Sequence, residues 1–406
     1  MPEDPTPVET SPRWRPNRWQ VLVALVVVIV AGALVIAVLP GSPPAATATP
    51  NTITVSRTSC GKGWTQPAGG AQTLTMSNQD TNNAEADVVE VGGANNGKVY
   101  GELAGLGAGT SAPLRVTLGP GTYAIRCLIE DIDPIMGPSV HVGGAAAANA
   151  AAVPVTSNDL LGPLKTYQTY IVAGVGTLVT RTDALDAAVR AGNQDLARTD
   201  WLSAHLTYET LGAAYNAFGD YDVEINGSTA GLPGGVADPD FTGFHRVEYG
   251  LWHGEGVASL TTVTDQLDGF VHGLRSDLPK IEPQALDLGL RAHEIMENAL
   301  RFELTGKTDE GSGTNLATAD ANLAGDREVI SVLRPLLVGR YPQLSDVDAW
   351  SARFQALVEA QRQSNGTWTP ISKLSQATRE KLNGTLSQLT ELLAPIAAIA
   401  EPRRVS

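Results

Sequence analysis

Three of the six histidines in the chain each stand one helical turn before a glutamate. His205 is followed by Glu209, and His245 is followed by Glu248. Residues three or four apart share one face of a helix, so each pair would present an imidazole beside a carboxylate. The third block, RAHEIMENALRFEL, supplies His293, Glu294 and Glu297.

Metal binding is the chemistry that this pattern favours. Imidazole and carboxylate side chains that project from facing helices into a bundle hold iron or manganese. Imidazole suits iron, copper and zinc, whereas carboxylates favour harder ions. Asp240, in the Gly/Pro-rich loop before His245, is a further candidate oxygen ligand. We therefore predict one shared metal site; the alternative is a set of ordinary surface ion pairs, each worth roughly 0.2–0.5 kcal/mol.

A zinc peptidase is a second interpretation of the HEIME segment. Such an enzyme needs His-Glu-x-x-His on one helix, with the glutamate as general base. Here Glu297 stands where the second histidine belongs. Glu294 could serve as the base, but the ligand set for an open zinc position is incomplete. The pattern therefore favours metal capture over peptide hydrolysis.

The elements that must position these residues are predicted to be helices. Beyond residue 157, apolar residues recur at helical spacing through most of the chain, as in DLLGPLKTYQTYIVAGVGTLVTRTDALDAAVRAG. The main interruption is the loop INGSTAGLPGGVADPDFTG, which leads directly into FHRVE. Residues 158–402 are therefore predicted to form an all-α bundle.

Residues 53–142 follow a different pattern. Short runs such as TLTMSNQD and PLRVTLGPGTYAIRC end at Gly, Asn or Pro, which is typical of strands. A Gly-Pro-Gly turn between two β-rich runs predicts a hairpin. We expect a small β-sandwich here, flanked by linkers over 40–52 and 143–157.

The N-terminal segment predicts a membrane anchor. Three arginines precede the uncharged apolar run VLVALVVVIVAGALVIAVL, which is long enough to cross a bilayer. We expect residues 1–19 to be a cytoplasmic tail and residues 20–39 a single transmembrane signal anchor. The body would then lie outside the cytoplasm, in the periplasmic or cell-envelope space. A small-residue run follows the anchor, so the sequence also allows later cleavage.

Charge and cysteine content narrow the function further. A formal net charge of -15 argues against a nucleic-acid partner. The two cysteines, Cys60 and Cys127, both lie in the predicted exported body, where an oxidising environment favours a disulfide between them. The alternative is that Cys127 is a metal ligand.

Three blocks of the helical region carry a family resemblance. WLSAHLTYETLGAAYNAFGDYDVEIN, GFHRVEYGLW and RAHEIMENALRFELTGKTDEGSGTNLAT resemble, in this order, the imelysin/EfeO family of extracytoplasmic iron-uptake proteins. The similarity covers Asn158 to about Ala400 and includes a His-x-x-Glu signature at His245 and Glu248. It implies an imelysin-like bundle that binds ferrous or ferric iron. The β-rich segment resembles the cupredoxin-like domain that precedes this bundle in longer members.

The resemblance also implies partners and a role. The metal would pass to an iron permease in the membrane, and a haem peroxidase of the dye-decolourising type would work beside it. The role implied is that of a non-enzymatic transport protein, although the family has also been labelled a metallopeptidase. His245 and Glu248 match the signature pair. The other two recurrent blocks contain His205, Glu209, His293, Glu294 and Glu297.

A second metal site in the β-rich segment is implied by the same resemblance. A blue-copper centre needs a histidine shortly after its cysteine, and after Cys127 the next one is His141. Long family members resemble this chain in carrying Cys-x-x-Glu instead. A disulfide to Cys60 would remove the soft ligand and make the site structural. The candidate ligands are Cys127, Glu130 and either Glu85 or Glu102.

Three classes of function follow from these patterns. The first is a transport protein that captures iron, with copper or zinc as further metals that the ligands suit. The second is an enzyme, either a metallopeptidase or a metal oxidase with a copper site in the β-rich segment. The third is a tethered module in which the His–Glu pairs lie far apart and are incidental. The clustering of the pairs favours the first class.

Overall fold

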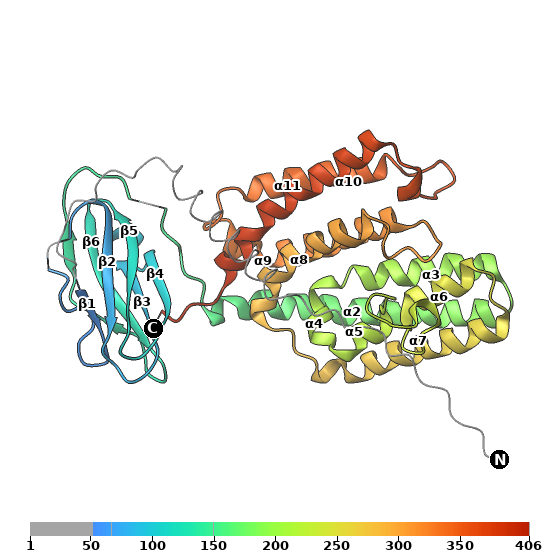
Figure 1. Ribbon diagram of the computed structural model, residues 1–406, viewed down its shortest axis with the longest axis horizontal. Helices are drawn as coiled ribbons and strands as arrows, with labels where there is room; N and C mark the ends of the chain where they lie inside the picture. Colours follow the sequence, from blue (N-terminus) through green and yellow to red (C-terminus); the bar gives the residue numbers. More distant parts are fainter. Residues whose placement is uncertain (1–51, 66, 149, 406) are drawn as a thin grey trace, which may run out of the picture. The chain divides into compact units, whose positions relative to one another are not determined.

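A computed structural model describes residues 52–65, 67–148 and 150–405 (Figure 1). The predicted cytoplasmic tail and membrane anchor, residues 1–39, lie outside these residues. No helix in the described part of the chain is both long enough and apolar enough to cross a membrane. A sheet-rich region comes first and a helical domain follows it, which confirms the predicted order.

Two sheets make up the sheet-rich region. The first has the strand order β1-β2-β5, with β1 parallel to β2 and β5 antiparallel. The second runs β4-β3-β6-β7, and β8 also pairs with β6. The strands are β1 (Thr52–Val55), β2 (Gly70–Asn78), β3 (Ala84–Glu90), β4 (Val99–Leu106), β5 (Ser111–Leu118), β6 (Gly121–Ile129), β7 (Ile135–Met136) and β8 (Val140–Val142).

The two sheets share one hydrophobic core. Successive residues of a strand point to opposite faces, so alternate positions contribute to it. Leu74 and Met76 of β2 and Val88 of β3 are almost completely buried in the same cluster as Ile125 of β6. The predicted hairpin is wrong: β5 and β6 follow one another across Gly119 and Pro120, but β5 pairs with β2 and β6 pairs with β3, so the connection crosses from one sheet to the other.

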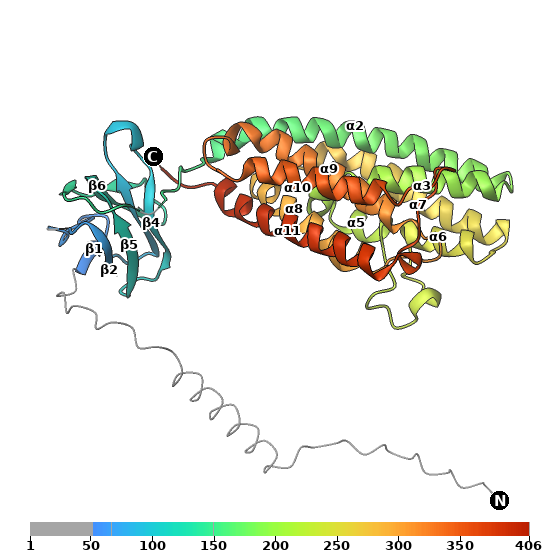
Figure 2. The ribbon, with the colours of Figure 1, turned by 90° about the horizontal axis from the view of Figure 1, so that it is seen from above.

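The helical domain is a bundle whose long helices run side by side (Figure 2). A π-helical turn, Ala299–Glu303, directly follows one of them. The α-helices are α2 (Ser157–Arg190), α3 (Gln194–Glu209), α4 (Tyr215–Phe218), α5 (Asp220–Ile225), α6 (Gly243–Trp252), α7 (Val257–Asp277), α8 (Ala285–Asn298), α9 (Asn315–Leu337), α10 (Leu344–Glu359) and α11 (Gln376–Ala400).

Helix α2 shows how local sequence sets these elements. Thr156 caps its first turn by accepting a hydrogen bond from the backbone N–H of Asp159, and the Asp159 carboxylate accepts one in return from the Thr156 backbone. This reciprocal cap satisfies donors that the first helical turn leaves without partners. Leu160, Tyr167 and Ile171 then recur at helical spacing and are buried. The spacing turns one side of α2 toward the bundle core.

The long helices of the bundle pack in two groups that α9 joins. Helix α2 packs against α3 and α7, while α8 packs against α9 and α11. Helix α9 also contacts α2 and α3, so it links the two groups. Short helices α5 and α6 pack against α7, and α6 also packs against α3. The facing surfaces of α3, α6 and α9, together with the π-helical turn, enclose the polar residues of the candidate site.

Candidate metal centre

Helices α3 and α6 bring two of the predicted histidines together. The ring centroids of His205 and His245 are 5.4 Å apart, and the two residues are only 2% and 5% exposed. Trp201 holds the helices in place because its Nε1 donates a hydrogen bond of 2.9 Å to the Phe244 carbonyl oxygen. The ring of Trp201 also packs 5.0 Å from that of His205. Two imidazoles from separate helices therefore meet in a water-poor interior.

The turn into α6 requires a glycine. Gly243 has a φ of 77°, a conformation that side chains other than glycine rarely adopt. A Cβ at this position would lie 2.2 Å from the carbonyl oxygen of Ile225. The close approach of the two backbones aims the start of α6, and His245 follows two residues later. A larger residue at position 243 would therefore displace the histidine.

His205 lacks hydrogen-bond partners. Its Nε2 lies 3.2 Å from Oε1 of Glu209, but neither ring nitrogen makes a well-aligned hydrogen bond to any described residue. Both nitrogens are inaccessible to solvent. A buried polar atom without a partner is costly, and such atoms need a functional explanation. A bound cation would supply the missing interaction, so His205 fits the role of a metal ligand.

Glu248 links His245 to the loop that follows the π-helical turn. Its Oε2 lies 3.4 Å from Nδ1 of His245. Its Oε1 accepts hydrogen bonds from the backbone N–H groups of Glu310 (3.1 Å) and Ser312 (3.0 Å). Burial alone would raise the pKa of Glu248, but the contacts with His245 and Ser312 outweigh it and lower that pKa. The carboxylate is therefore held in its charged form.

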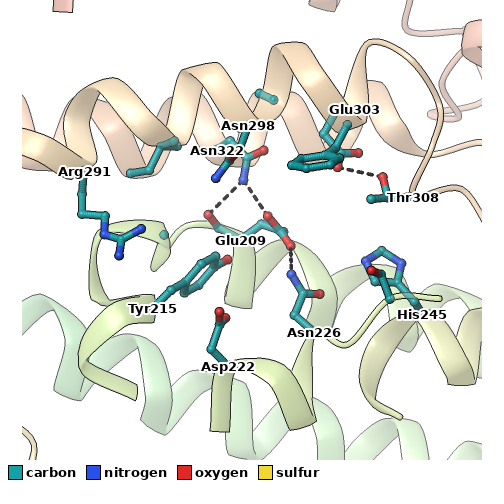
Figure 3. Close-up of a pocket in the computed structure, with 15 residues that line it drawn as sticks. Glu209, Tyr215, Asp222, Asn226, His245, Arg291, Asn298, Glu303, Thr308 and Asn322 are labelled. Atoms are coloured by element: carbon teal, nitrogen blue, oxygen red, sulfur yellow. Dashed lines mark hydrogen bonds between the residues drawn. The ribbon is translucent and has the colours of Figure 1, made fainter. Parts of the chain in front are cut away.

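Glu209 is fixed by two asparagine side chains (Figure 3). Asn226 donates to its Oε1 at 2.8 Å and Asn322 donates to its Oε2 at 2.6 Å. Burial opposes ionisation of Glu209, yet His205 and these two amides lower its pKa below the ordinary value. Such outer partners orient ligands and tune metal affinity.

Glu303 is a candidate ligand that the His–Glu spacing does not reveal. It ends the π-helical turn, is 8% exposed, and accepts hydrogen bonds of 2.9 Å from Thr308 Oγ1 and Asn315 Nδ2. Burial, and then the charge of Glu209, raise its pKa. No histidine lies one turn away from it in sequence. Single π-helical turns often occur at functional sites, but their position is not evident from periodicity.

An ion-sized void lies among these residues. Its volume is about 10 Å³, close to the minimum that holds one water molecule. A larger cavity of about 220 Å³ shares His245, Glu303 and Thr308 with it and is also lined by Glu209 (Figure 3). The residues that line the void itself include His205, His245, Glu248 and Glu303.

The buried ligand atoms are less tightly gathered than a group on the surface. Among described residues, only Asp183, Asp268 and His272 place one ligand atom each within 4.8 Å of one another. His272 Nε2 lies 2.9 Å from Asp183 and 3.6 Å from Asp268, at partly exposed positions on α2 and α7. These groups therefore satisfy one another without a metal. In the buried group, by contrast, the two ring nitrogens of His205 make no hydrogen bond to a described residue.

The α8 residues predicted to join the site lie elsewhere. Nδ1 of His293 is 3.0 Å from the Thr390 carbonyl oxygen of α11, and Glu294 pairs with Arg291 at 2.8 Å. The Glu297 side chain is 45% exposed. On α8 the cavity is lined instead by residues at positions 291, 295 and 298, which share a different face. The structure thus brings two of the three predicted blocks together through their His–Glu pairs, and the third contributes Glu303.

Asp240 is likewise placed away from the imidazoles. It is exposed, and its backbone N–H donates to Oδ1 of Asp238 at 3.0 Å in the loop before α6. It lines neither the void nor the larger cavity. The loop therefore leads into the helix that carries His245, but the Asp240 carboxylate does not lie in the centre.

The predicted Cys-x-x-Glu site in the sheet-rich region is corrected by the structure. Cys127 forms a disulfide with Cys60, so it has no thiolate to offer, and the disulfide alternative is confirmed. Cys127 pairs with Ala86 and points into the shared core, whereas Glu85 pairs with Leu128 and belongs to the opposite face of the sheet. Glu130 is exposed.

Comparison with known proteins identifies the family of the helical domain. The family model of imelysin matches residues 163–396, which includes both histidines, and the chain belongs to the imelysin family. It is 29% identical to the iron uptake system component EfeO of Escherichia coli O157:H7 over 308 residues, covering 74% of this chain and 79% of the relative. It is 28% identical over the same length to proteins of that name from Escherichia coli K12 and Shigella flexneri.

Proposed function

We propose that this protein is the iron-binding component of an iron-uptake system and captures ferrous or ferric iron in the buried His/carboxylate centre. The observation that carries the proposal is the imidazole of His205, which is buried and has no hydrogen-bond partner among described residues, facing His245 across an ion-sized void. The names of the similar proteins support iron as the cargo.

The proposed ligands are His205, His245, Glu248 and Glu303, with Glu209 beside them. Two imidazoles suit ferrous iron, and carboxylates add the hard oxygen donors that ferric iron prefers. The imidazoles also suit copper and zinc, so these ions are expected to compete. Closing the centre around a cation requires the ligand atoms to move inward, because they are not all within 4.8 Å of one another.

An extracytoplasmic location is part of the proposal. The Cys60–Cys127 disulfide supports it, since disulfides persist mainly in oxidising compartments. The apolar run after the N-terminal arginines supports a single-pass anchor in the cell membrane, with the body in the periplasmic or cell-envelope space. Captured iron would pass to a membrane permease, and a haem peroxidase of the dye-decolourising type would act in the same system.

Neither enzymatic alternative is favoured. A peptidase of the His-Glu-x-x-His type needs both histidines on one helix face, whereas the imidazoles of this centre come from α3 and α6. An oxidase with a cupredoxin-type copper site needs a cysteine thiolate, and Cys127 is in a disulfide. The cupredoxin-like character of the sheet-rich region stays a prediction.

Metal titration tests the proposal. The purified full chain, stripped of metal, is titrated anaerobically with ferrous sulfate, and bound iron is counted by elemental analysis, with cupric and zinc ions compared. We expect tight binding of one iron and at least about 100-fold weaker binding in His205→Ala, which loses a direct ligand. His253→Ala is the matched control, because His253 is exposed and contacts Tyr249, through the Tyr249 carbonyl oxygen and by stacking on its ring, and lines neither the void nor the larger cavity. Unchanged iron affinity in a folded His205→Ala variant would contradict the proposal.

A further inference from the structure

One wall of the ion-sized void is a loop. Residues 304–314 join the π-helical turn to α9. The loop residues that line the void are Thr308, Asp309, Ser312 and Thr314. The carboxylate of Glu248 reaches this loop from α6 and is bound to its backbone. The conformation of the loop therefore sets the position of one of the proposed ligands.

The loop occupies one of the two carboxylate oxygens of Glu248. Its Oε1 accepts hydrogen bonds from the backbone N–H groups of Glu310 at 3.1 Å and Ser312 at 3.0 Å. A carboxylate oxygen has about two lone-pair positions, so these two bonds use both of them. The other oxygen, Oε2, lies 3.4 Å from Nδ1 of His245. Oε2 is therefore the oxygen that Glu248 can offer to a cation.

Asp309 holds the loop in the conformation that presents these donors. Its Oδ1 accepts hydrogen bonds of 2.9 Å from the backbone N–H groups of Gly311 and Gly313. The two glycines stand on either side of Ser312 in the sequence. Successive N–H groups of the loop therefore point alternately to Glu248 and to Asp309, and the two carboxylates share one run of backbone donors.

The end of the loop is set by a glycine. Gly313 has a φ of 69°, a conformation that residues with a side chain rarely adopt. A Cβ at this position would lie 2.9 Å from Cγ of Pro370. The N–H of Gly313 thus reaches Asp309 from a backbone position that a larger residue would shift.

We infer that Asp309 is a positioning residue of the metal centre, which folds the 304–314 loop so that it holds Oε1 of Glu248 and leaves Oε2 for the cation. This inference rests on the proposed function and concerns the control of one ligand in the same site. Without Asp309, the two glycine N–H groups lose their acceptor and the loop can leave the conformation that binds Glu248. Glu248 would then stay on α6 but lose the fixed direction of its carboxylate. Outer partners of this kind orient ligands and tune metal affinity.

A positioning residue and a direct ligand place opposite demands on this side chain. Asp309 lines the void, so both roles must be separated by experiment. A positioning residue needs an acceptor oxygen in the place of Oδ1, which asparagine also supplies. A direct ligand needs the negative charge, which asparagine lacks. Asp309→Asn keeps the acceptor without the charge, and Asp309→Glu keeps the charge but moves the oxygens by one methylene group.

Anaerobic titration of the metal-free full chain with ferrous sulfate is the test. We expect Asp309→Ala to weaken iron binding by about 10-fold and Asp309→Asn to stay within about threefold of the unchanged chain. Asp309→Glu should bind iron more weakly than Asp309→Asn. The melting temperature of each variant is measured alongside. If Asp309→Ala does not fold, the order of the other two variants decides, and tighter binding by Asp309→Glu would overturn the inference.

Asp238→Ala is the matched control. Asp238 also accepts two backbone hydrogen bonds in a loop, from the N–H groups of Gly234 at 2.9 Å and Asp240 at 3.0 Å. It lines neither the void nor the larger cavity. This substitution should therefore change iron affinity by less than about twofold.

A double-mutant cycle shows whether Asp309 acts through Glu248. In a Glu248→Ala chain the loop has no carboxylate to hold, so adding Asp309→Ala should weaken iron binding further by less than about twofold. A further loss of about 10-fold in that chain, or unchanged affinity in a folded Asp309→Ala variant, would overturn this inference and leave the proposed function standing. Failure of the unchanged chain to bind iron would overturn the proposed function itself.

Discussion

Two histidine clusters in this bundle have opposite properties. On the surface of α2 and α7, Nε2 of His272 lies 2.9 Å from Asp183 and 3.6 Å from Asp268. The His272 side chain is 51% exposed. In the interior, His205 is 2% exposed, and its ring nitrogens make no hydrogen bond to a described residue, although Nε2 lies 3.2 Å from Oε1 of Glu209. The ligand atoms of the surface cluster lie closer together. The interior cluster contains the buried ring nitrogens that make no hydrogen bond to a described residue.

This difference shows why close spacing alone does not identify a metal site. Exposed charges are solvated and screened, so an ion pair between them contributes roughly 0–1 kcal/mol and gains little from replacement by a metal. A buried imidazole without a partner carries a desolvation cost that a cation can offset. We therefore expect tight iron binding at the interior cluster and weak binding at the surface cluster.

After His205→Ala, the largest effect on this contrast is expected from Glu303→Gln. The substitution keeps the shape of a side chain that lines the void but removes its charge, so iron affinity should fall by about 10- to 100-fold or more. Isothermal titration of the metal-free full chain measures the change. Glu297→Gln is the control, because Glu297 lies earlier on the same helical segment and its side chain is 45% exposed. This substitution should change the affinity by less than about twofold. Equal losses in both variants would remove Glu303 from the centre.

A pH titration should give the next largest effect. Burial lowers the pKa of His245, but Glu248, Glu303 and Glu209 raise it more, so its pKa lies above the ordinary value of about 6.5. Iron must displace this proton, and affinity should therefore rise with pH by up to about tenfold per unit until the folded-state pKa is passed.

The sign of the stability effect is opposite. A raised folded-state pKa means that protonated His245 stabilises the metal-free fold below pH of about 6.5, and this contribution is lost as pH rises. Binding and melting curves between pH 5.5 and 8.5 check both trends. His272→Ala should leave the pH dependence of iron affinity as it is, whereas an unchanged affinity across this range would contradict the assignment of His245.

A smaller effect is expected from Asn322→Leu. Asn322 donates to Oε2 of Glu209 at 2.6 Å and holds that carboxylate beside His205. Loss of an outer partner of this kind typically weakens metal binding by about 10-fold. The iron dissociation constant and the melting temperature of the variant are both measured. A weaker affinity at an unchanged melting temperature would show that the substitution disturbs the orientation of Glu209 and not the fold. Weaker stability with unchanged affinity would make Asn322 purely structural.

The smallest effect on iron is expected from removal of the disulfide. Cys60 and Cys127 are 67 residues apart, and the cross-link should stabilise the sheet-rich region by about 4 kcal/mol. The Cys60→Ser, Cys127→Ser variant should unfold this region at lower denaturant concentration and keep iron affinity within about twofold. A large loss of iron binding would instead place part of the site in the sheet-rich region.

Periodicity and motif spacing predicted the sheet-rich region, the helical domain and the two His–Glu pairs that meet. They did not predict which side of α8 faces the cavity, because His293 and Glu294 have the same local pattern as residues that face inward. Glu303 was missed because a π-helical turn shifts the spacing that a regular helix would impose. For Cys127, compartment and spacing left two alternatives, and only the strand pairing with Ala86 shows that the sulfur points into the core.

Iron-edge anomalous diffraction from crystals of the iron-loaded full chain tests the central claim most directly. The account predicts one strong anomalous peak between His205 and His245, within coordination distance of Glu248 or Glu303. A strong peak at Asp183, Asp268 and His272, with none between the buried histidines, would contradict it.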